Sequence, residues 1–428
     1  MTDANGEFAT EPVPDDRTVP WLRVGVISAM VAFSLPTFVT GIEVATATAP
    51  RTAALAILGG NVLLSIIGAL CGAIGAQIRL SSYMLTRVAF GTRGAAIVNL
   101  AFALSLLGWF GVNIDLFGEA VLRLCRDVFG WTAMPWTVEL FAGVAMTVTT
   151  IYGFRAINTL SLWLVPVLMV VTALLLAKAL GSSSLPANLE AADVTGLGFG
   201  HAMSSVVGGV IIGAIILPDI TRFIREWRGG IYTAFLSYAV IGSIVQAAGA
   251  LAAIAFGNDD LLDMMIVVGL SWAAFAIVIA GSWILNSLNL YSTTLSIEAT
   301  LPRLPNTPLI LALGALGTVA AFFNILDVFL TFLFYLAVVF APVAGVIAVD
   351  CLFVRRSAYH AERLSQERSL IPSALFAWAA GAVVALLGAS GYLTVTGVAA
   401  LDAIAVAAIA YLVTSRLGAL QSPGVSNG

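Results

Sequence analysis

The amino-acid sequence predicts an all-α protein that crosses a membrane twelve times, and two observations carry that prediction. Of its 428 residues, 60% are hydrophobic and only 10% are charged, whereas soluble domains carry about 25% charged residues. The mean hydropathy is +1.02, and apolar runs of about 20 residues, each long enough to cross a bilayer, recur along the chain. These properties exclude a soluble enzyme and favour one polytopic membrane domain.

Charge and cysteine usage exclude further classes of protein. The formal net charge of -4 gives no basic surface for nucleic acid. Cys71, Cys125 and Cys351 are widely separated, so we expect no disulfide framework, no metal centre and no cofactor. Segment 1–21 lacks the cationic stretch that precedes the apolar core of a signal peptide, and it is predicted to be a cytoplasmic tail.

The twelve expected helices are apolar runs bounded by charged residues, Pro or Gly. They cover residues 22–49, 53–78, 95–122, 137–154, 158–180, 197–220, 231–256, 264–296, 308–325, 327–350, 371–391 and 396–415. An even number places both termini on one side. If that side is the cytoplasm, only four of the 19 Lys and Arg residues lie outside: Arg51, Arg123, Arg126 and Lys178. Because cationic loops resist translocation, we expect cytoplasmic termini in a multi-pass protein of the cell (inner) membrane.

Helices one and six both contain residues that interrupt helical structure. Pro36 removes a backbone donor in the first, and the sixth contains Gly208, Gly209, Gly213 and Pro218. Either break alone could be an ordinary kink. Since helix one enters from the cytoplasm and helix six from outside, the pair predicts a five-plus-five inverted repeat with a binding site at the midplane. Freed backbone groups at such breaks can bind a polar solute.

Helix three carries an indole and an amide on one face, because Trp109 and Asn113 are four residues apart. The indole offers a stacking surface and the amide a paired donor and acceptor, which suits a planar heteroaromatic solute. The other interpretation is a packed Trp with an interhelical Asn hydrogen bond. Asp115 lies on a different face and is assigned to packing or to a gate.

Helix eight carries a polar stripe along an otherwise apolar surface. Ser282, Asn286, Asn289 and Thr293 fall at helical spacing. Amides at that depth are costly unless they meet protein, water or solute. They either contact the solute or join helix eight to helix one.

Ionisable and small polar residues near the breaks are the candidates for coupling and gating. Glu43 lies about two turns beyond the break in helix one, where an acid must be protonated, paired or hydrated. It is either a proton carrier or a hydrated residue at the outer end of the helix. Ser34 and Pro36 mark the break itself. Asp219 is expected to pair with Arg222 and fix a loop.

An intramembrane protease is excluded by the order of its required residues. The sequence Gly-Ala-Ser-Gly at 388–391 contains a candidate nucleophile, Ser390, but both histidines, His201 and His360, precede it. A rhomboid-type protease needs the His after the Ser, so we expect no enzyme. An ion channel would need repeated subunits or a filter sequence, and neither is visible.

Three stretches in order resemble the nucleobase/cation symporter family 1, in particular bacterial cytosine permeases. They are Gly-Trp-Phe-Gly-Val at 108–112, the segment 206–223 with its Pro-Asp-x-x-Arg-Phe, and Pro-Val-Ala-Gly-Val-Ile-Ala-Val-Asp-Cys-Leu-Phe-Val-Arg-Arg at 342–356. The resemblance implies a LeuT-like fold with two additional C-terminal helices and a cavity between helices one, three, six and eight. It also implies that Trp109 stacks on the solute, and Asn286 matches the helix-eight Asn.

Departures from that family bear on the solute and on the coupling ion. Leu106 stands where cytosine permeases have Gln, and Gly209 and Val210 stand where they have Ser-Phe. Sodium-coupled relatives have two hydroxyl residues where Ile284 and Leu285 stand here. Because an aliphatic carbon cannot coordinate sodium, the resemblance favours proton coupling.

Together these features predict five regions and one function. The regions are a tail (1–21), a first repeat (22–181), a second repeat (197–350), two additional helices (371–415) and a tail (416–428). We expect a secondary transporter that imports a nucleobase or related heterocycle, binding it through Trp109, Asn113, Gly208, Gly209, Val210, Asn286 and Asn289. The alternative is a sodium-coupled importer of hydantoin, allantoin or a thiamine precursor.

Overall fold

The computed structural model describes residues 11–191, 196–271, 281–301, 303–323, 329–359, 368–390, 392–393 and 395–420. Their regular structure is helical, apart from a single bridge between Val19 and Ile224. His360 and Gly391 lie outside the described residues.

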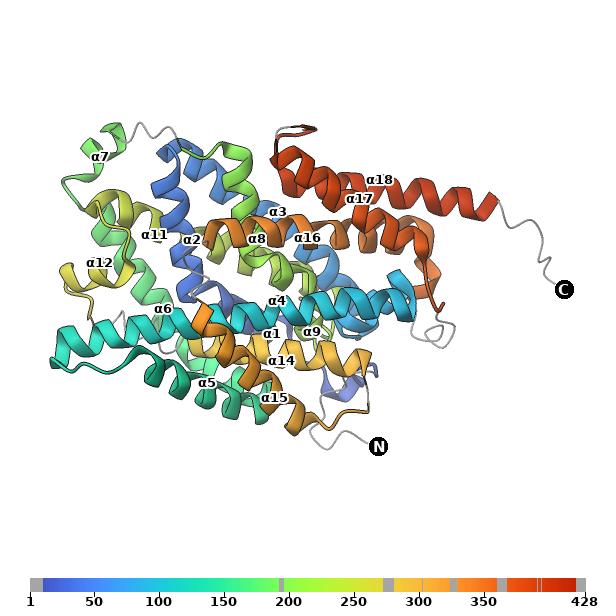
Figure 1. The fold of residues 1–428 in the computed structure, drawn as a ribbon, viewed down its shortest axis with the longest axis horizontal. Helices are drawn as coiled ribbons and strands as arrows, with labels where there is room; N and C mark the ends of the chain where they lie inside the picture. The colour runs from blue at the N-terminus through green and yellow to red at the C-terminus, as the bar shows by residue number, and fades with distance from the viewer. Residues whose placement is uncertain are drawn as a thin grey trace.

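The helices run in the following order (Figure 1): η1 (Asp15–Arg17), α1 (Trp21–Ala32), α2 (Leu35–Ala47), α3 (Pro50–Ile78), α4 (Ser82–Phe129), α5 (Pro135–Ile151), α6 (Gly153–Leu180), α7 (Leu185–Ala191), α8 (Phe199–Ile215), α9 (Pro218–Thr221), α10 (Trp227–Ala234), η2 (Phe235–Gly242), α11 (Ser243–Phe256), α12 (Leu261–Val267), α14 (Trp283–Thr300), α15 (Asn306–Ala320), η4 (Ala321–Phe323), α16 (Phe329–Val349), η6 (Asp350–Val354), η7 (Arg356–Tyr359), α17 (Pro372–Ala389) and α18 (Ala399–Leu420).

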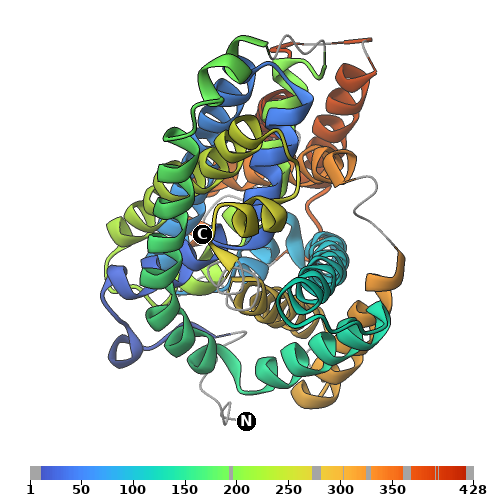
Figure 2. The same ribbon diagram turned by 90° about the vertical axis from the view of Figure 1, so that its left-hand side faces the viewer.

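The all-α membrane class is confirmed. Among the described residues, eight helical stretches are long and apolar enough to span a bilayer, and the bent pair of α1 and α2 makes a ninth. In Figures 1 and 2, α17 and α18 lie on one side of the bundle, and α5 and α15 lie on the opposite side. The helices between them enclose the core of the molecule.

Helix one is interrupted where the sequence contains Pro36. α1 and α2 meet at a bend of 50°. Ser34, between them, has extended backbone angles, and its Oγ donates to the carbonyl oxygen of Val31 at 2.8 Å. Pro36 lies in the first turn of α2, where its missing N–H costs nothing because that amide would have no intrahelical partner. The side-chain bond of Ser34 therefore satisfies one of the carbonyls that the break frees.

The sixth helix is continuous through its glycines, which corrects the expectation that they interrupt it. α8 includes Gly208, Gly209 and Gly213 and ends at Ile215. The chain turns at Ile216, and Pro218 starts the four-residue α9. The glycines instead permit close packing. A Cβ at Gly208 would overlap the carbonyl oxygen of Leu333 in α16, so only Gly allows these two backbones to approach.

The predicted start of the eighth helix is wrong, whereas the third helix begins close to its predicted start. α4 spans Ser82–Phe129, but its backbone is not helical at Gly91, where φ is 78°, so the helix predicted from residue 95 is the part of α4 that follows this kink. The eighth helix was expected over 264–296, but α12 ends at Val267 and Gly269 follows with a φ of 79°. Glycine accommodates both positive angles because it has no Cβ. The apolar residues of α12 pack against α2 and α11 at the end of the molecule where α7 lies (Figure 1).

A buried carboxylate joins the end of α16 to α18 and to the kink of α4. Asp350 is fully buried and accepts hydrogen bonds from Tyr359 at 2.8 Å and from Tyr411 at 2.7 Å. Arg355 pairs with it at 2.7 Å and also donates to the carbonyl oxygen of Val88 at 2.5 Å. A buried charge is tolerated when it is paired and fully hydrogen-bonded in this way. The family signature at 342–356 thus contains the residues of an interhelical anchor.

Substitutions at Gly208 and Gly209 provide a matched test of the close packing between α8 and α16. We expect Gly208→Ala to lower the stability of the protein by about 1–3 kcal/mol or more, because the new methyl group overlaps backbone atoms. Gly209→Ala is the control, since the nearest atom to a Cβ there is 3.6 Å away. Thermal unfolding in detergent compares the two variants, and equal unfolding temperatures would contradict the close α8–α16 approach.

Candidate functional site

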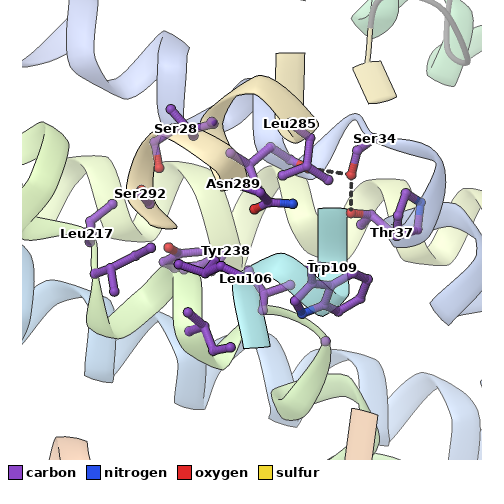
Figure 3. A pocket seen from close by; sticks show the side chains of 18 of the residues that line it. Ser28, Ser34, Thr37, Leu106, Trp109, Leu217, Tyr238, Leu285, Asn289 and Ser292 are labelled. Carbon is purple, nitrogen blue, oxygen red and sulfur yellow. Dashed lines mark hydrogen bonds between the residues drawn. The ribbon is translucent and has the colours of Figure 1, made fainter. Parts of the chain in front are cut away.

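The breaks and the polar stripe meet at a cavity of about 90 Å³ (Figure 3). It lies among α1, α2, α4, α8, α9, η2 and α14, as the sequence resemblance implied for helices one, three, six and eight. Its wall is mostly apolar. The lining residues are Ser28, Val31, Ser34, Pro36, Thr37, Thr40, Leu106, Trp109, Gly209, Val210, Ile212, Gly213, Ile216, Leu217, Asp219, Ile220, Tyr238, Leu285, Leu288, Asn289 and Ser292.

One end of the cavity is formed by the indole of Trp109 and the hydroxyls of the helix-one break. Trp109 contacts Phe332 edge-to-face, with ring centroids 5.5 Å apart, and Phe329 at 6.2 Å. These contacts restrict the orientation of the indole. Ser34 and Thr37 lie beside it in Figure 3, with their hydroxyl oxygens 3.3 Å apart. This end therefore combines an aromatic surface with short polar groups.

α14 contributes the polar residues of the middle of the cavity. Asn289, Ser292 and Leu285 line it, and in Figure 3 Asn289 lies between Trp109 and Ser292. An amide at this position can donate and accept together. Of the residues in the predicted polar stripe, Asn289 lines the cavity; Ser292, which was not part of that stripe, also lines it.

The other end contains Asp219, which sequence reasoning assigned to a loop. Asp219 is 2% exposed, lines the cavity, and accepts hydrogen bonds from the backbone N and the Oγ of Ser82 at 2.9 and 2.7 Å. Its position directly after Pro218, at the end of an apolar helix, is the sequence feature that could have indicated a place in the cavity wall. The expected partner, Arg222, is fully buried beside it and donates from Nε to the backbone oxygen of Asp219 at 3.0 Å.

Two amides expected to contact the solute lie outside the cavity wall. Asn113 is fully buried, and its Nδ2 donates to the carbonyl oxygen of Trp109 at 2.7 Å. Asn286 is also fully buried and donates to the carbonyl oxygen of Phe110 at 3.0 Å, which joins α14 to α4. Asn286 therefore makes an interhelical hydrogen bond, whereas the bond of Asn113 lies within α4. The Oδ1 atoms of both have no hydrogen-bond partner among the described residues.

Three more candidate residues are separated from the cavity. Gly208 faces α16 rather than the solute space. Glu43 is half-buried on α2, and neither it nor Asp115 is among the lining residues. Spacing along a helix predicted which residues share a face, but it could not predict which face borders empty space.

The helix-one break contacts the start of α14. A Cβ at Gly281 would lie 2.6 Å from the carbonyl oxygen of Phe33. The next residue, Ser282, is fully buried, and its Oγ has no hydrogen-bond partner among the described residues. Ile284 is buried and Leu285 lines the cavity. Among the described residues, no group of three His, Cys, Asp or Glu side chains is arranged to hold a metal ion.

Comparison with known proteins agrees with this geometry. A family model described as permease for cytosine/purines, uracil, thiamine, allantoin matches residues 13–413. The chain is 28% identical to the cytosine permease of Escherichia coli (strain K12) over 415 residues, covering 96% of this chain and 95% of the relative. It is 28% identical to the hydantoin permease of Microbacterium maritypicum over 302 residues, covering 63% and 60% of the two proteins.

The fold matches a solved transporter over nearly its whole length. Mhp1, a nucleobase-cation-symport-1 family transporter in a closed conformation with bromovinylhydantoin bound, superposes with a TM-score of 0.78 at 21% identity, covering 99% of this chain and 97% of that one. These relatives are permeases and transporters, not enzymes. Because the family model matches residues 13–413, nearly the whole chain, the chain belongs to the family of permeases for cytosine/purines, uracil, thiamine and allantoin.

Proposed function

We propose that this permease imports a small planar nitrogen-containing solute, a nucleobase or related heterocycle, by cation-coupled alternating access. The observation that carries the proposal is the cavity bounded by Trp109, Asn289 and the helix-one break. An aromatic face and an amide suit a flat ring with a hydrogen-bonding edge. The match to cytosine and hydantoin permeases supports this class of solute.

We propose twelve spans with a five-plus-five inverted repeat in residues 22–181 and 197–350. The bend between α1 and α2 and the break between α8 and α9 are the two related interruptions. Residues 371–415 form two further helices, and both termini face the cytoplasm of an inner-membrane protein. The distribution of cationic residues supports this orientation.

The solute contacts are assigned to the residues that line the cavity. Trp109 stacks on the ring, Asn289 reads its polar edge, and Gly209 and Val210 provide a close backbone surface. Asn286 joins α14 to α4, Asn113 is bonded within α4, and neither residue lines the cavity in this conformation. Leu106 on the wall disfavours a solute that needs a further amide there.

Proton coupling is favoured over sodium coupling. Ile284 and Leu285 provide no oxygen at the positions where the sequence resemblance expects hydroxyls. The rival is a sodium-coupled importer of hydantoin, allantoin or a thiamine precursor. The Oγ of Ser282, which has no hydrogen-bond partner in the described part of the chain and lies next to the helix-one break, is the observation that favours this rival.

Replacing Trp109 tests the stacking assignment. We expect Trp109→Ala to weaken solute binding about tenfold, because stacking contributes on the order of 1 kcal/mol beyond area burial. Binding is measured by thermal shift across purines, pyrimidines, hydantoins, allantoin and vitamin precursors, since a ligand stabilises the folded state. Trp163→Ala on the exposed surface of α6 is the control. Unchanged affinity in Trp109→Ala would exclude stacking.

The two asparagines of α14 separate solute recognition from helix packing. We expect Asn289→Leu to lower apparent affinity about tenfold or more, because an unpaired buried polar group costs roughly 1–3 kcal/mol. Asn286→Leu should instead lower the unfolding temperature, since it removes the bond to Phe110. Transport assays and thermal unfolding distinguish these effects. If Asn286→Leu lowered the apparent affinity and Asn289→Leu lowered only the unfolding temperature, Asn286 rather than Asn289 would be the solute-binding residue.

Imposed gradients in proteoliposomes test the coupling ion. Uptake should follow an inward proton gradient and persist in sodium-free buffer. Counterflow of labelled against unlabelled solute, measured without gradients, establishes that the protein is a carrier. Uptake that requires a sodium gradient and ignores pH would favour the rival, and Ser282→Ala should then abolish the sodium response.

A further inference from the structure

Asp219 is the one carboxyl group among the described residues that line the cavity. Its Oδ1 is held by the backbone N and the Oγ of Ser82, the first residue of α4. Its Oδ2 is buried and accepts no hydrogen bond from the described residues. The carboxyl group is therefore held through Oδ1, while Oδ2 is buried near the side chain of Tyr83.

The groups around Asp219 have opposite effects on its protonation. Asp219 is buried in a mostly apolar wall, which is unfavourable for a charged group, but Arg222 lies beside it and Ser82 donates two hydrogen bonds to it, which stabilises a carboxylate. The other titratable groups that face this region are Tyr83 of α4, Tyr238 of η2 and Tyr291 of α14. A group under such opposed influences can change its protonation when the access of water changes.

The cavity connects Asp219 with the stacking residue. In Figure 3, Leu217, two residues before Asp219 in the chain, and Ser292 of α14 lie on the side of the cavity away from Trp109. α9 also packs against α1, the first half of the interrupted helix. Movement of the helices around the cavity would therefore change the hydration of Asp219 and the shape of the solute site together.

We propose that Asp219 is the coupling carboxyl group of this permease. Oδ2 takes up a proton from the outside solution when the cavity is open outward, and it releases that proton to the cytoplasm when the cavity opens inward. Arg222 and Ser82 stabilise the carboxylate that remains. This inference rests on the proposed transport function, and it replaces Glu43, which does not line the cavity, as the proton carrier.

The experiment compares two carboxyl groups in proteoliposomes. Asp219→Asn keeps an oxygen to accept the bonds from Ser82 but cannot ionise. We expect the ratio of pH-driven accumulation to gradient-free counterflow to fall at least about tenfold in Asp219→Asn and to match the wild type in Glu43→Gln. Loss of the pH response in Glu43→Gln alone would overturn the proposal. So would a wild-type protein that shows counterflow but no pH response.

A second variant keeps the test valid if Asp219→Asn does not fold. Ser82→Ala removes one hydrogen bond to the carboxylate and leaves the backbone donor. Because the protonated acid then becomes relatively more stable, pH-driven uptake should persist to a higher external pH, by about one unit. A lower rate with an unchanged pH midpoint would reject a coupling role for Asp219. Absence of counterflow in the wild type would instead refute the proposed transport function.

Discussion

The interruption of the first helix is the constraint on which the rest of the site depends. In a bilayer, free backbone groups are tolerated only where they meet protein or a polar cavity. At the break, the Ser34 hydroxyl donates to the carbonyl oxygen of Val31, and the carbonyl oxygen of Phe33 lies against Gly281 at the start of α14. The cavity at the break combines a mostly apolar wall with the hydroxyls of Ser34 and Thr37, and the helices that surround it form the proposed solute site.

Close helix packing keeps that cavity small and well defined. Gly208 lets α8 approach α16 at backbone distance, while its neighbour Gly209 borders the cavity. Gly41 and Gly249 similarly bring α2 and α11 together, because a Cβ on either would overlap or crowd backbone atoms of the other helix. Small residues at helix contacts are the usual means of association in membranes, where no hydrophobic force drives helices together. These glycines thus allow close contact between helices and do not interrupt them.

The two ends of the cavity have different chemistry. Trp109 is held by phenyl rings of α16 and offers a surface, whereas Asp219 is held by the first residue of α4 and offers a proton acceptor. α4 thus contributes to both ends, and its kink is anchored through Arg355 to the buried Asp350. The anchor also contacts Tyr411 of α18. The C-terminal helices therefore stabilise the helix that carries the site.

The sequence by itself determined the membrane class and the break at Pro36, and it selected Trp109 and Asn289, which both line the cavity. These properties follow from composition, from the missing amide of proline and from helical spacing, all of which are local. Only the tertiary structure decided that Asn113 and Asn286 are bonded away from the cavity, that Gly208 faces α16, and that Asp219 reaches the cavity wall. The reason is that helical spacing relates residues within one helix, whereas the boundary of a cavity depends on how neighbouring helices are rotated and packed.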